Sequence, residues 1–110
     1  MQITCVQRGE VLVIAVKGRM DHAASPEFDR TFAECRARGR KLFVVDLKEL
    51  DYISSAGLRS LLAAVQNLKQ CNGQMRLCGL GGLVRDVFAA SGFDSIFNVC
   101  DSIDEAVKFG

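Results

Sequence analysis

Two neighbouring serines, Ser54 and Ser55, are the residues of this chain whose type and position best suit chemistry at a surface. They lie in the stretch DYISSAGLR, residues 51–59, between a predicted strand and the first turn of the clearest predicted helix. The start of a helix offers unpaired backbone N–H groups and the positive end of the helix dipole, which together hold an anion such as phosphate. Serine is also a common N-cap, so local chemistry by itself favours a cap.

The sequence offers little for catalysis. His22 is the single histidine, and Ile53 stands where a nucleophile elbow of the Gly-x-Ser-x-Gly type requires glycine. No group of histidines and cysteines has metal-ligand spacing. The Gly79–Gly82 run is typical of a helix entry rather than a phosphate-binding loop, and Asp46 is interpreted as a loop or capping residue. We therefore expect a protein that is not an enzyme and that uses no cofactor or metal.

Composition excludes several further classes. The 110 residues suit one domain, residues 1–110, and the formal net charge of +1 gives no reason to expect nucleic acid or a membrane as partner. Five cysteines, an odd number, are interpreted as buried reduced thiols rather than as a disulfide framework. No signal peptide and no membrane-length apolar run is visible. We therefore expect a cytoplasmic protein.

Hydrophobic patterns predict alternating strands and helices. Ser25-Pro26 predicts a helix cap and first turn, and the leucine-rich stripe from Leu58 to Leu68 predicts the longest helix. Predicted strands cover residues 3–8, 11–17, 42–47, 75–78 and 96–99; further helices follow residues 82 and 102. The first two strands read as a hairpin around Gly9-Glu10. The expected class is α/β: a mixed, mostly parallel sheet of about five strands with an N-terminal β-hairpin and about four helices.

Three segments stand out in chain order: Gly18 to Asp21, VVDLKELDYISSAGLRSLL at residues 44–62, and residues 83–93. In this order and spacing they resemble the STAS-domain family, and specifically the bacterial anti-sigma factor antagonists. Residues 44–62, VVDLKELDYISSAGLRSLL, resemble the family's strand–loop–helix signature. The residues Gly18 to Asp21 resemble its G-x-L-D motif in the preceding loop. Residues 83–93 resemble the region near the end of the domain. The resemblance covers essentially the whole chain and implies a single STAS domain.

The resemblance also assigns roles to residues. The family's phosphoacceptor falls on Ser55, with Ser54 as the alternative, because many members have aspartate before the acceptor where this chain has serine. Asp21 corresponds to a loop aspartate near the acceptor; it is either a turn residue or a carboxylate that a phosphoserine would repel. The implied partner-binding surface consists of Asp21, Ser54, Ser55, Ala56, Gly57, Leu58 and Arg59.

The function implied by this resemblance is partner switching. The unphosphorylated protein would bind an anti-sigma-factor-type serine/threonine kinase, relieving its inhibition of a sigma factor or another target. Phosphorylation by that kinase would end the binding, and a metal-dependent serine phosphatase would restore it. A monomer is expected. Two alternatives stay open: a nucleotide-sensing STAS module that uses Gly79–Gly82, and a small hydrolase that uses Ser55.

Overall fold

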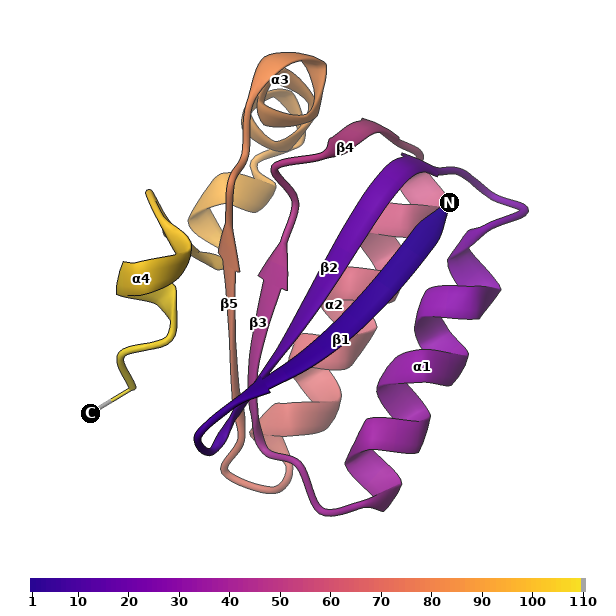
Figure 1. Cartoon of the computed structure of the whole chain (residues 1–110). Helices are drawn as coiled ribbons and strands as arrows, with labels where there is room; N and C mark the ends of the chain where they lie inside the picture. The colour runs from indigo at the N-terminus through magenta and orange to yellow at the C-terminus, as the bar shows by residue number, and fades with distance from the viewer. Residues whose placement is uncertain (110) are drawn as a thin grey trace.

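Six strands form one sheet in the computed structural model, which describes residues 1–109 (Figure 1). The elements are, in chain order, β1 (Gln2–Arg8), β2 (Val11–Met20), α1 (Ser25–Ala37), β3 (Leu42–Asp46), β4 (Leu50–Ile53), α2 (Ser55–Lys69), β5 (Gln74–Cys78), α3 (Gly82–Ser91), the 3₁₀ turn η1 (Phe93–Ser95), β6 (Asn98–Cys100) and α4 (Ile103–Ala106). No helix among these residues has the length and apolar character needed to cross a membrane.

The sheet order is β1-β2-β3-β5-β6, and β4 pairs separately with the end of β2. The hairpin of β1 and β2 is antiparallel, whereas every other strand pair is parallel. Each parallel step along the main order needs a crossover, and α1, α2 and α3 supply these crossovers. The predicted α/β class, the mostly parallel sheet and the N-terminal hairpin are therefore confirmed.

The central strands are apolar on both faces because helices cover both. Leu12 and Ile14 of β2 belong to the main core beneath α1 and α2, which lie side by side on one face of the sheet (Figure 1). Their neighbours Val11 and Val13 point to the opposite face, where the yellow α4 packs with its buried Ala106. This alternation follows from the period of two in a strand.

The structure differs from the predicted elements in three places. Strand β4 was not predicted, because four residues with polar Asp51 and Tyr52 at their centre carry no recognisable strand pattern. The last strand begins at Asn98 rather than residue 96, since η1 takes up the chain before it. Strand β2 continues to Met20, so most of the motif expected in a loop is strand.

The cysteines are free thiols, but their burial varies. Cys35 and Cys78 are buried, Cys71 and Cys100 are half-buried, and Cys5 is exposed on the edge strand β1. The expectation that they behave as buried small hydrophobes is therefore correct for two and wrong for Cys5. The edge strand β1 is exposed at six of its seven residues, so Cys5 is left uncovered there.

Candidate functional site

Ser54 lies between the end of β4 and the first residue of α2, and its polar atoms form hydrogen bonds within the protein. Its hydroxyl oxygen accepts a hydrogen bond from the backbone N–H of Gly57 at 3.2 Å, which makes it the N-cap of α2. The same hydroxyl donates to the backbone oxygen of Met20 at 3.4 Å, and the backbone N–H of Ser54 donates to that oxygen at 3.0 Å. Ser54 therefore joins the start of α2 to the end of β2.

Ser55 has the opposite surroundings. It is the first residue of α2, it is exposed, and its hydroxyl makes no hydrogen bond with any residue in the described part of the chain. Within the same residues, the backbone N–H groups of Ser55 and Ala56 also lack a protein partner, as expected for the first turn of a helix. A group attached to Ser55 would thus extend into solvent beside free N–H donors.

The first turn of α2 is pressed against the end of β2. A Cβ atom on Gly57 would lie 2.7 Å from Ile53 Cγ1 and 2.8 Å from the backbone oxygen of Met20, so only glycine fits. Leu58 is buried in the main core. Of the implied partner-binding residues after Ser55, Arg59 is therefore exposed and Ala56 half-buried, whereas Gly57 and Leu58 have little surface of their own.

Asp21 comes directly after β2 and forms a turn. Its Oδ1 accepts a hydrogen bond from the N–H of Ala24 at 2.9 Å, and its backbone oxygen accepts from Ser25 Oγ at 2.7 Å. The N-cap of α1 is Ala24, so the predicted cap at Ser25 is wrong by one residue, and the Asp21 carboxylate satisfies the helix start instead. Asp21 and Ser54 each follow the paired residues Met20 and Ile53, which brings both near the same edge.

A shallow hollow of about 350 Å³ lies between the starts of α1 and α2. Its lining residues, which define the helix-start hollow, are His22, Ser25, Pro26, Asp29, Ala56, Arg59, Ser60 and Ala63. Arg59 is exposed and forms no ion pair among residues 1–109, although Asp29 lines the same hollow. Sequence analysis missed Asp29 because the helical spacing of apolar residues in α1 marks its buried face and does not report an exposed polar residue beside it.

Two residues near the serines form a further contact that sequence analysis missed. Arg19 of β2 pairs with Tyr52 of β4, and its guanidinium carbon lies 4.2 Å from the centre of the tyrosine ring. Such a cation–π contact holds the arginine in place on the surface. An Arg and a Tyr in separate segments give no signal until β4 is known to pair with β2.

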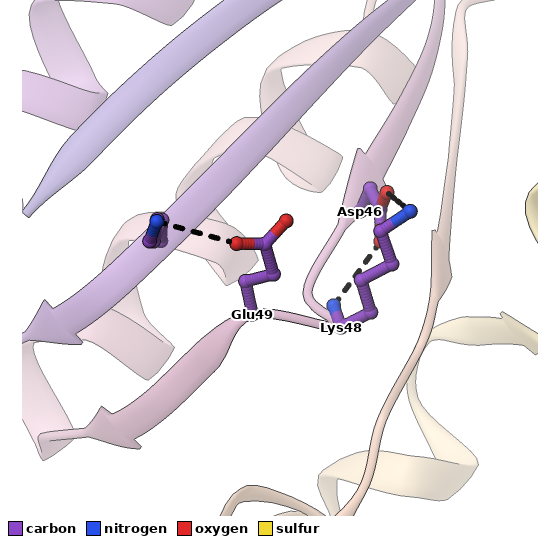
Figure 2. Close-up of polar contacts among 4 residues, drawn as sticks. Asp46, Lys48 and Glu49 are labelled. Atoms are coloured by element: carbon purple, nitrogen blue, oxygen red, sulfur yellow. Dashed lines mark hydrogen bonds and ion pairs between the residues drawn. The ribbon is translucent and has the colours of Figure 1, made fainter.

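A second hollow, also of about 350 Å³, lies on the sheet beside β1, β2 and the turn after β3. This sheet-face hollow is lined by Gln2, Thr4, Ala15, Val16, Lys17, Asp46, Lys48 and Glu49. Figure 2 shows how Lys48 folds back over Asp46, whose carboxylate lies 3.9 Å from Lys48 Nζ and accepts the Lys48 backbone N–H at 3.1 Å. Lys17 pairs with Glu49 at 3.6 Å.

The structure refines the interpretation of Asp46. It is the last residue of β3 and only 5% exposed, so it is not in a loop, but it does cap the turn as predicted. Its charge also acts on the neighbouring strand. Burial raises the pKa of the Cys78 thiol to about 11, and the Asp46 carboxylate contributes because it disfavours a nearby thiolate.

The glycine loop between β5 and α3 has a packing role. Gly79 has φ +78°, and a Cβ there would lie 2.6 Å from the backbone nitrogen of Lys48. The Gly79–Gly82 loop lines neither the helix-start hollow nor the sheet-face hollow. Among residues 1–109, no group of three or more histidine, cysteine, aspartate or glutamate side chains is arranged to hold a metal ion.

Comparison with known proteins agrees with this architecture. The STAS domain family model matches residues 2–106. BtrV from Bordetella bronchiseptica, named as an anti-sigma factor antagonist, is 38% identical over 106 residues, which is 96% of this chain and 91% of BtrV. Proteins of this type are regulators without enzymatic activity.

Solved structures share the fold at lower identity. A Thermotoga maritima structure described as an anti-sigma factor antagonist superposes with a TM-score of 0.88 at 18% identity, covering 94% of this chain and 90% of that one. The phosphorylated form of the Bacillus cell fate determinant SpoIIAA gives a TM-score of 0.74 at 20% identity, covering 96% of both chains. With the family model and BtrV, the chain belongs to the STAS domain family, as an anti-sigma factor antagonist.

Proposed function

We propose that this protein is a partner-switching regulator controlled by phosphorylation of Ser55. In its unphosphorylated form it binds an anti-sigma-factor-type serine/threonine kinase and relieves that kinase's inhibition of a sigma factor or another target. The observation that carries the choice of residue is the contrast between the two serines. The Ser54 hydroxyl both accepts and donates a hydrogen bond within the fold, whereas the Ser55 hydroxyl is exposed and makes none among residues 1–109.

The chemistry belongs to the kinase, which supplies the active site and ATP. Ser55 Oγ attacks the γ-phosphorus of ATP; the new Oγ–P bond forms as the bond between that phosphorus and the bridging oxygen of ADP breaks. The hydroxyl proton leaves with the kinase's base or solvent. The exposure of Ser55 supports this step, because the hydroxyl can enter another protein's active site without unfolding α2.

Phosphorylation then ends the complex by electrostatics. The phosphate adds nearly two negative charges at a surface that the partner must cover closely. Binding is therefore opposed by the cost of desolvating that charge and by electrostatic repulsion at the interface. The contact surface on this hypothesis comprises Asp21, Ser54, Ser55, Ala56 and Arg59, with Gly57 and Leu58 beneath it. A metal-dependent serine phosphatase resets the switch, and the protein acts as a cytoplasmic monomer.

The test begins with affinity capture from the native host, followed by mapping of phosphate and co-purifying proteins by mass spectrometry. The kinase identified there is then titrated with purified variants by calorimetry. Ser55→Ala keeps binding and abolishes phosphorylation, whereas Ser55→Asp weakens binding by about tenfold or more. Ser54→Ala tests the choice of acceptor: it removes the adjacent hydroxyl, and mass spectrometry should still find phosphate on Ser55.

Two outcomes would overturn parts of the proposal. Equal affinity of Ser55→Ala and Ser55→Asp for the kinase would remove the charge switch itself. Phosphate on Ser54 alone would move the acceptor by one residue and contradict the argument from the free hydroxyl. Light scattering on the purified protein tests the monomer separately.

A further inference from the structure

Arg59 lies one helical turn after Ser55 on the same side of α2. Residues four apart on a helix have Cβ atoms about 5–6 Å from each other, so their side chains can touch. Both residues are exposed, and both belong to a helix of 15 residues that is anchored by the Ser54 cap. Ser54 is five residues before Arg59 and is directed inward, so the geometry favours Ser55 alone as the neighbour of this arginine.

The guanidinium of Arg59 has no acidic partner in the part of the chain that the structure describes. His22, in the turn before α1, and Asp29 of α1 line the helix-start hollow together with Arg59, but neither forms an ion pair with it among residues 1–109. Arg19, near the end of β2, is held over the ring of Tyr52. Among the residues that the structure describes, Arg59 is therefore a cation without an ion pair, next to the Ser55 hydroxyl, which has no hydrogen-bond partner.

We propose that Arg59 captures the phosphate on Ser55 within the same molecule. This inference rests on the proposed phosphorylation of Ser55 and adds a second effect to it. The planar guanidinium offers a fork of N–H donors that suits two phosphate oxygens, and the free N–H groups of Ser55 and Ala56 lie at the same helix start.

The consequence is that phosphorylation changes two features of the docking surface at once. It adds a phosphate, and it withdraws from the partner a cation that the unphosphorylated protein presents beside the helix-start hollow. The pair also favours the doubly ionised phosphate, because a nearby positive charge stabilises the charged form. Arg59 is a positioning residue in this role, since it acts on the phosphate and not on the kinase's chemistry.

The experiment needs no kinase. The full chain is produced with phosphoserine inserted at position 55 during translation, and the phosphate is titrated by phosphorus NMR. Arg59→Gln raises the second pKa of the phosphoserine by about 0.5 relative to the unsubstituted phosphoprotein, as expected for an exposed ion pair. Arg59→Lys restores part of the difference, because it keeps the charge and loses the fork.

Arg38→Gln is the matched control, since Arg38 is an exposed arginine at the other end of α1 that forms no ion pair among residues 1–109. It leaves the phosphoserine pKa unchanged. An Arg59→Gln protein that titrates like the unsubstituted phosphoprotein would overturn the capture of phosphate by Arg59. That result is independent of whether a kinase phosphorylates Ser55, which the mass spectrometry of the native protein decides separately.

Discussion

The helix-start hollow and the sheet-face hollow have the same volume, about 350 Å³, and both carry side chains of each charge. They differ in how those charges are arranged. In the sheet-face hollow, Lys17 and Lys48 are each paired with a carboxylate of the same turn region. In the helix-start hollow, Arg59 and Asp29 share the lining without pairing, and the free hydroxyl of Ser55 is on the adjoining helix turn.

The difference separates a structural arrangement from one that is available for binding. Paired charges are already satisfied inside the protein, so a partner that displaced them would have to compensate for the lost contacts. An unpaired arginine beside an exposed hydroxyl has no such contact within the protein to give up when it binds a partner or a phosphate. Equal volume therefore says little about function, whereas the state of the charged groups discriminates between the two hollows.

The largest expected effect is the loss of the close packing between the first turn of α2 and the ends of β2 and β4. Gly57→Ala forces a Cβ against Ile53 and the Met20 backbone oxygen, which should lower the free energy of unfolding by about 2–3 kcal/mol. Urea denaturation followed by circular dichroism measures it. Gly81→Ala is the control, because a Cβ at Gly81 meets no atom within 4 Å. Equal stabilities of the two variants would contradict the close approach of α2 to β2.

The next effect concerns the buried thiol of Cys78, which lies near the Asp46 carboxylate of the sheet-face hollow. The pKa of Cys78 is raised to about 11 in the folded protein, above its value of 9.0 in an unfolded chain. Between these values the unfolded state loses the thiol proton and the folded state keeps it, so stability falls as pH rises. The loss reaches on the order of 2 kcal/mol between pH 9 and pH 11.

Comparing the pH dependence of unfolding for the unsubstituted protein and Cys78→Ala isolates this contribution. The variant should lose less stability over the same pH range, since its remaining titrating groups are unchanged. Asp46→Asn serves as a second check. Removing the carboxylate lowers the pKa of Cys78 in the folded protein, so the pH range over which the thiol affects stability becomes narrower. Parallel curves for Cys78→Ala and the unsubstituted protein would show that the thiol does not titrate in this way.

A smaller effect distinguishes the two serines. Ser54→Ala removes the N-cap of α2 and should cost about 1 kcal/mol in unfolding free energy. Ser55→Ala removes an exposed hydroxyl with no partner and should change stability by less than about 0.5 kcal/mol. Thermal unfolding of both variants under the same conditions gives the difference. The reverse order would mean that Ser55, not Ser54, supports the helix.

The smallest effect is expected at the exposed ion pair of the sheet-face hollow. Lys17→Gln breaks its contact with Glu49, but both side chains are more than half exposed. The loss should be below about 0.5 kcal/mol and should vanish at high salt, which screens exposed charges. Chemical denaturation at low and high ionic strength measures it. A larger loss that persisted in salt would indicate that this pair is a rigid part of the fold.

Much of the architecture could be predicted from local patterns. The hairpin follows from two β-rich runs on either side of Gly9-Glu10, and residues 42–47 form a short continuous apolar run typical of a covered strand. The leucine stripe of α2 repeats at helical spacing, because one face of that helix is buried. Strand β4 could not be predicted in this way. Its four residues pair with β2 through backbone groups, and two of the four side chains are exposed, so the hydrophobic pattern does not report it.

In the candidate site, too, some features could be predicted from local sequence and others depended on contacts between distant segments. The sequence determined that two hydroxyls stand at the start of a helix, and it determined the family resemblance on which Ser55 was chosen over Ser54. Only the tertiary structure decided which hydroxyl is used inside the fold, because that depends on Met20 reaching Ser54 from a strand 34 residues earlier in the chain. It also decided which cations are already paired. Hydrogen bonds and ion pairs between distant segments leave no periodic trace in the sequence, and they set the chemistry that remains available at the surface.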